Sequence, residues 1–125
     1  MKPYLLGALI LSVMLAACST QNKDEREADK ITRSVIANDM RPVENDFADA
    51  PRQKMTRLAV ARLSDQLNNL GKYKGIKEDT PQGSVAGSHT FTVTFAKETW
   101  HESMVVDSGG KISAWKIGPG TATAQ

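Results

Sequence analysis

Few side chains in this sequence could carry metal or nucleophilic chemistry. The chain has one cysteine, Cys18, and two histidines, His89 and His101, and none of them belongs to a His-x-x-x-His or Cys-x-x-Cys pattern. A zinc site needs three or four ligands that converge on one point. The sequence also lacks a glycine-rich phosphate loop followed by a helix. We therefore predict no metal site, no cofactor and no nucleophilic catalytic residue.

The best case for catalysis is an acid–base role for Glu102. This glutamate interrupts the apolar face of a predicted strand, between Trp100 and Met104. If its side chain points inward, the loss of water raises its pKa and lets it act as a base. The other interpretation is a local bulge, or a sheet face partly open to solvent, and the sequence favours that one. We therefore assign no catalytic residue and expect a non-enzymatic protein, with a small acid–base enzyme as the alternative.

A binding role is more economical, and its candidate contacts are Trp100, Glu102 and Trp115. Tryptophan is enriched at the energetic centres of interfaces. The two tryptophans could equally lie in the core, because the chain has only three phenylalanines and two tyrosines besides them. The partner could be another envelope protein, an apolar ligand or a second copy of the chain.

The N-terminal segment has the three parts of a secretory signal. Lys2 supplies a positive charge, an apolar run extends from Tyr4 to Leu15, and two alanines precede Cys18. The run is too short to span a hydrocarbon core of ~30 Å comfortably, so residues 1–17 are interpreted as a signal peptide.

The sequence Leu15-Ala16-Ala17-Cys18 also resembles the lipobox of bacterial lipoproteins. The resemblance implies cleavage before Cys18, lipid on its sulfur and attachment of the chain to a membrane. In lipoproteins of the enteric type, serine at the next position, here Ser19, favours the outer membrane on its periplasmic side. The alternative is an ordinary secretory signal with a chance cysteine.

Charge argues against a nucleic-acid partner. The chain has 16 basic and 14 acidic residues, a formal net charge of +2, and no basic stripe. Nucleic-acid-binding domains normally carry such a stripe.

The remaining chain divides into a tether, one domain and a tail. Residues 18–27 consist of Cys18 and the polar residues after it, which are predicted to form a flexible tether. Residues 28–117 are predicted to form a single α+β domain, and residues 118–125 a disordered tail.

The first half of the domain has a helical period. Residues 28–37 are predicted to form one helix that stops at Asn38 and Asp39. Asp39 then caps a second helix with Pro42 in its first turn, although one long helix kinked at Pro42 is the alternative. A third helix follows the N-cap Thr56 and ends before Gly71. Its predicted core stripe consists of Ala59, Val60, Leu63, Leu67 and Leu70.

The second half has the period of strands. We expect a weak strand at residues 73–78, and strands at 87–98, 99–107 and 111–117. In the second of these, Phe91, Val93 and Phe95 alternate with threonines. Asp107 begins a hairpin turn that contains two glycines. The phase of the last strand stays open, because Ile112 and Trp115 would lie on opposite faces of a regular strand.

Helices followed by strands predict an α+β fold, with two or three N-terminal helices packed on one face of a curved antiparallel sheet of about four strands. This order, together with the turns at Asn38-Asp39, Leu70-Gly71 and Asp107-Ser108-Gly109-Gly110, resembles the cone-shaped nuclear transport factor 2-like (cystatin-like) superfamily, and in particular its small bacterial domains of unknown function. The resemblance implies a fold and no catalytic residue.

Overall fold

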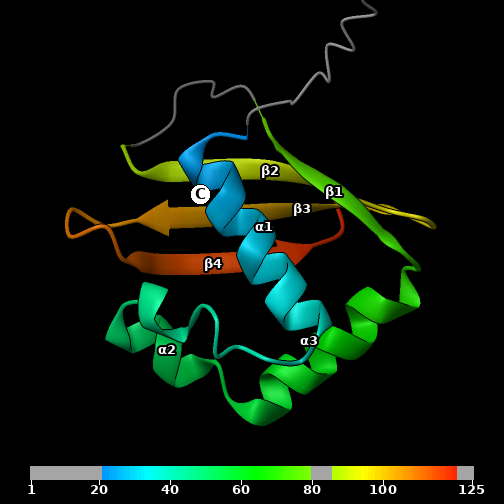
Figure 1. Cartoon of the computed structure of the whole chain (residues 1–125), viewed down its shortest axis with the longest axis horizontal. Coiled ribbons are helices and arrows are strands. Elements are labelled where there is room, and N and C mark those ends of the chain that lie inside the picture. The colour runs from blue at the N-terminus through cyan, green and yellow to red at the C-terminus, as the bar shows by residue number, and fades with distance from the viewer. Residues whose placement is uncertain (1–20, 80–85, 121–125) are drawn as a thin grey trace, which may run out of the picture.

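The computed structural model describes residues 21–79 and 86–120, and these form one layer of helices on an antiparallel sheet (Figure 1). The helices are α1 (Lys23–Ile36), the short 3-10 helix η1 (Glu44–Asp46), α2 (Asp49–Lys54) and α3 (Arg57–Asn69). The strands are β1 (Tyr73–Glu78), β2 (Ser88–Phe95), β3 (Thr99–Val106) and β4 (Ile112–Gly118). The predicted α+β class, with helices before a curved sheet, is confirmed.

The sheet is a meander in which each strand pairs with the next, in the order β1-β2-β3-β4. In Figure 1, α1 crosses one face of the sheet, whereas α2 and α3 lie on the β4 side of the molecule. The core lies between α1 and the sheet. Its buried members include Ile31, Phe91, Val93, Met104 and Ile112.

The first helix is longer than predicted, because it begins at Lys23 rather than near residue 28. Residues 23–27, assigned to a tether from the sequence, are therefore helical. Asn22 is the N-cap, and its side chain accepts a hydrogen bond from the N–H of Glu25. Asp24 and Glu25 in the first turn add favourable charge at the positive end of the helix dipole.

The predicted second helix with Pro42 in its first turn is wrong, and so is the alternative of one kinked helix. The carboxylate of Asp39 binds the N–H and the guanidinium of Arg41 and does not cap a helix. A turn and η1 follow, and Phe47 is extended, forming a parallel bridge with Ile112. The short helix here is α2, which starts only after this bridge.

The third helix and the strands follow the sequence closely. Thr56 caps α3 through a bond from the N–H of Ala59, and Gly71 adopts a left-handed φ of 83° after the helix. On α3, Val60 and Leu67 are buried, whereas Ala59 is exposed. The inward faces of β2 and β3 are the predicted ones, with Phe91, Val93 and Phe95 on β2.

A β-bulge settles the phase of β4. Val106 pairs with Ile112 and Val105 pairs with Ala114, so one extra residue, Ser113, is inserted into β4. An inserted residue reverses the alternation of the strand that carries it. Ile112 is therefore buried, and Trp115 nevertheless lies on the same inward side.

Candidate functional site

Glu102 points into the interface between the sheet and α1 and is 1% exposed. Interpreting it as a bulge or a solvent-facing residue was wrong. The register of β3 is regular here, and Glu102 lies opposite Phe91 on β2 and Ile117 on β4. It therefore occupies an inward position in an otherwise apolar face.

Both oxygens of the Glu102 carboxyl have protein partners. Oε1 accepts a hydrogen bond from the indole N–H of Trp115, and Oε2 lies 2.7 Å from the hydroxyl oxygen of Thr32 on α1. That hydroxyl also lies 2.8 Å from the carbonyl oxygen of Ala28. We call these three side chains and this carbonyl the Glu102 network. It joins β3, β4 and α1.

The network is complete when Glu102 is neutral. Thr32 has a single hydroxyl hydrogen, so it cannot donate to Ala28 and to Glu102 together. A protonated Oε2 donates to Thr32, which then donates to Ala28, while Trp115 donates to Oε1. Burial is the largest influence on this carboxyl and raises its pKa to about 7; the hydrogen-bonding contacts with Thr32 and Trp115 lower the pKa, and the negative charge of Asp29 raises it further.

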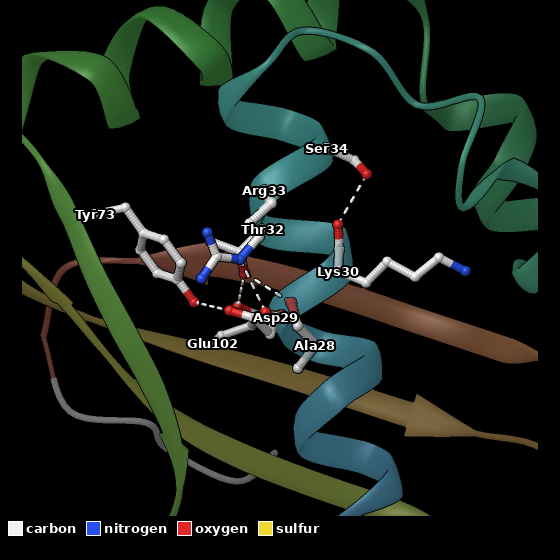
Figure 2. Close-up of polar contacts among 8 residues, drawn as sticks. All are labelled: Ala28, Asp29, Lys30, Thr32, Arg33, Ser34, Tyr73 and Glu102. Atoms are coloured by element: carbon white, nitrogen blue, oxygen red, sulfur yellow. Dashed lines mark hydrogen bonds and ion pairs between the residues drawn. The ribbon is translucent and has the colours of Figure 1, made fainter. Parts of the chain in front are cut away.

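A second polar group lies beside the network (Figure 2). The hydroxyl of Tyr73 on β1 donates to Asp29 on α1 over 2.5 Å, and the Nε of Arg33 donates to the same carboxylate over 2.9 Å. The Arg33 guanidinium lies 4.9 Å from the centre of the Tyr73 ring. Burial, and then the hydrogen bond to Asp29, raise the pKa of the Tyr73 hydroxyl. The pair ties α1 to β1.

The surface carries an apolar groove of about 360 Å³ between α2, α3 and β4, which we call the β4 groove. Trp115 of β4 lines it, so one residue belongs both to the groove and to the Glu102 network. Its other apolar lining residues are Val35, Met40, Ala50, Pro51, Met55, Ala59, Val60, Leu63 and Ala114, and its polar ones are Lys54 and Ser113.

The helix α2 forms one wall of the groove and has no buried residue. It is held at its start by the Phe47–Ile112 bridge and by the N–H of Ala48, which donates to the carbonyl of Ile112 over 2.9 Å. A short helix with so little burial has little stability of its own. The α2 wall is therefore held by less packing than the α3 and β4 walls.

A second hollow, of about 620 Å³, lies on the β1 and β2 strands. Lys74, Lys77, Glu78 and Asp79 line it, together with Thr92 and Thr94. Glu102 lines neither this hollow nor the β4 groove, and its oxygens are occupied by protein donors. Within residues 21–79 and 86–120, no three His, Cys, Asp or Glu side chains are grouped so that they could hold a metal ion.

The candidate residues from the sequence separate in the structure. Glu102 and Trp115 are brought together, whereas Trp100 is 8% exposed and donates its indole N–H to Glu98. Cys18 and Ser19 lie outside the described residues. The sequence analysis missed Thr32. The sequence feature that could have identified Thr32 is a polar residue on the same helical face as the apolar residues Ala28, Ile31 and Val35.

No protein-family model, curated protein or solved structure matches this chain. In the part of the chain that the structure describes, no helix has the length and apolar character needed to cross a membrane.

Proposed function

We propose that this chain is a lipid-anchored protein of the bacterial cell envelope, and that its domain binds a protein partner by taking an apolar side chain into the β4 groove. The observation that carries the binding role is the groove itself. Its volume of about 360 Å³ lies in the range of specific ligand pockets, about 300–1,000 Å³. Its lining is apolar except for Lys54 and Ser113.

The residues of the groove suit an interface. Met40 and Met55 line it, and methionine adapts its shape to different partners because its side chain is unbranched and polarizable. Trp115 supplies a large ring whose N–H is already bonded to Glu102. A partner therefore meets an aromatic surface with no unsatisfied donor.

The anchor is the second part of the proposal and rests on Leu15-Ala16-Ala17-Cys18. Lipid on Cys18 would hold the domain at a membrane, and Ser19 favours the outer membrane, facing the periplasm. Two or more acyl chains give stable attachment, whereas one is marginal. We retain the resemblance to the nuclear transport factor 2-like superfamily as part of this proposal, because the order of helices and strands agrees with it.

The alternative, an acid–base enzyme, has one observation in its favour. Glu102 has a pKa of about 7, which suits a general base at neutral pH. However, a base must come within hydrogen-bond reach of a substrate proton, and Glu102 is 1% exposed with both oxygens engaged. The binding role needs no such rearrangement.

The test is a peptide selection on the lipidated full chain in detergent. A random-peptide display library is selected on the chain, and the binding of each enriched peptide is then measured on two variants. Ala59→Phe adds a ring to an exposed residue that lines the groove, whereas Gln66→Phe adds the same ring to α3 outside the groove lining.

We expect Ala59→Phe to abolish peptide binding and Gln66→Phe to leave it unchanged. Circular dichroism of both variants checks that α3 is intact. If the selection enriches no peptide, or only peptides that bind both variants equally, the groove is not the binding site and the proposal is wrong.

A further inference from the structure

The strand β4 is an edge of the sheet, and part of its main chain faces away from β3. The N–H of Val106 donates to the carbonyl of Gly87, so the main chain of Val106 faces β2. Main-chain direction alternates along an antiparallel strand. Met104, two residues earlier on β3, therefore also faces β2, and its partner Trp115 directs its N–H and C=O outward.

The same alternation directs the main chain of Ile117 outward. Among the described residues, only Ala48 covers this edge, at its start, where its N–H donates to the carbonyl of Ile112. Beyond the bulge at Ser113, no other described residue donates to or accepts from the outer edge of β4. The outward groups of Trp115 and Ile117 are thus available for a further strand.

The opposite edge of the sheet, β1, is protected against the addition of a further strand, unlike the outer edge of β4. The strand β1 has an irregular register between Tyr73 and Gly75, and Gly75 has a φ of 144°. The carboxylate of Glu25 on α1 accepts from the N–H of Glu78 at the end of β1. Bulges, lysines and covering elements are the usual means of blocking strand addition at an edge. On β4, the bulge at Ser113 and the contact from Ala48 protect only the start of the strand, and Lys116 is the one lysine beyond them.

The open edge and the β4 groove are one continuous surface. Ser113, Ala114 and Trp115 belong to the edge strand and also line the groove. An alkyl chain in the groove could not use the outward N–H and C=O groups beside it, whereas a polypeptide main chain could. Strand addition with alternate side chains in a pocket is an established way of recognising extended peptides.

The charged residues near the groove and the open edge indicate which kind of peptide would bind there. Lys54 is the only charged residue that lines the groove, and Lys116 lies on the edge strand next to Trp115. Neither lysine takes part in the ion pairs found among residues 21–79 and 86–120. Because successive side chains alternate along a strand, Lys116 lies on the face of β4 opposite the groove. Each face of the edge therefore carries one lysine that can pair with an acidic residue.

We infer that the partner is an extended polypeptide segment that adds to β4 as a fifth strand, with an apolar side chain in the β4 groove and acidic residues beside Lys54 and Lys116. This inference rests on the proposed function and specifies its binding mode. The segment's N–H and C=O groups pair with Trp115 and Ile117, and its groove-facing side chain lies against α3.

The experiment is an N-methyl scan of a peptide from the selection, measured on the lipidated full chain. Methylation removes one peptide N–H at a time and leaves the protein unaltered. In an added strand, only every second N–H faces β4. We expect methylation at alternate positions to weaken binding about tenfold, and methylation at the positions between them to change it little.

A matched pair of variants tests the charge. Lys54→Gln should weaken binding of an acidic peptide about threefold at low salt and reduce its dependence on salt. Lys77→Gln, on β1, is the control and should leave both unchanged.

The outcomes separate the two proposals. If binding depends on the groove but the scan shows no alternation, strand addition is wrong and the groove holds a side chain in another way. If no peptide depends on the groove, both are wrong. Selected peptides without acidic residues would contradict the charge argument alone.

Discussion

Glu102 on β3 and Thr32 on α1 face each other across the main interface of the domain, with 2.7 Å between the carboxyl Oε2 and the hydroxyl oxygen. This contact joins α1 to the sheet, and both residues are buried in apolar surroundings. Buried polar side chains of this kind can specify one arrangement of a core. Trp115 donates to Glu102 and also lines the β4 groove, so the position of the Trp115 ring in the groove depends on the Glu102 network.

The first prediction concerns the pH dependence of stability. The pKa of Glu102 is about 7 in the folded chain, against an ordinary value of 4.5. A raised pKa means that the folded state keeps a proton that the unfolded state releases. The stabilising contribution is complete below pH 4.5, decreases as the pH rises to about 7, and totals about 3 kcal/mol.

Glu102→Gln mimics the neutral acid and cannot titrate. We expect the free energy of unfolding of this variant, minus that of the parent chain, to rise between pH 4.5 and 7 and then level off. Glu27 also has a pKa raised to about 7, by burial and by its hydrogen bond with Asp46. It is therefore replaced by Gln in both chains, so that it does not contribute to the pH dependence. Urea unfolding at several pH values measures the difference. A difference that stays constant with pH would contradict a raised pKa at Glu102.

The second prediction concerns Thr32. Thr32→Val keeps the shape of the side chain and removes the hydroxyl, which leaves Oε2 of Glu102 without a partner. An unsatisfied buried polar group costs about 1–3 kcal/mol, so we expect a loss of that size in urea unfolding at pH 6. Thr94→Val, on the exposed face of β2, is the control and should change stability by less than about 0.5 kcal/mol. Equal losses in the two variants would indicate a strand or helix effect rather than the network.

Local sequence signals predicted the elements that depend on neighbouring residues. The cap at Thr56, the turn at Asp107 and the alternation of β2 were all correct. In each case the atoms that decide the conformation lie within a few residues, as when Asp107 accepts from the N–H groups of Gly109 and Lys111. Such local features can therefore be predicted without knowledge of the rest of the fold.

The wrong predictions involve partners that are distant in the sequence. The orientation of Glu102 depends on Thr32, which is 70 residues away, and the failure of a helix at Pro42 depends on the bridge from Phe47 to Ile112. The phase of β4 required a bulge defined only by pairing with β3. The β4 groove was not predicted for the same reason, since it is formed by residues from three helices and one strand.

The third prediction concerns the approach of the β2 and β3 strands at Gly87. A Cβ atom on this residue would lie 2.4 Å from the carbonyl oxygen of Val106, and its φ is +82°. Gly87→Ala should therefore destabilise the fold by more than about 1 kcal/mol. Gly118→Ala is the control, because Gly118 has open space around it and no positive φ. Thermal unfolding of both variants measures the effect. If the Gly87 variant were as stable as the control, the tight approach of these strands would be wrong.

The fourth prediction concerns the anchor. Labelling cells with a palmitate analogue should modify the parent chain, whereas Cys18→Ser should remove the label and leave an uncleaved precursor. Ser19→Asp should keep the label, because the cysteine is intact, and move the chain from the outer to the inner membrane in an enteric host. Membrane fractionation after labelling measures both effects. The chain carries no other cysteine, so a thioester at another site cannot imitate the result. If Cys18→Ser is still cleaved and released, residues 1–17 act as an ordinary secretory signal, and the domain would meet its partner as a free periplasmic protein.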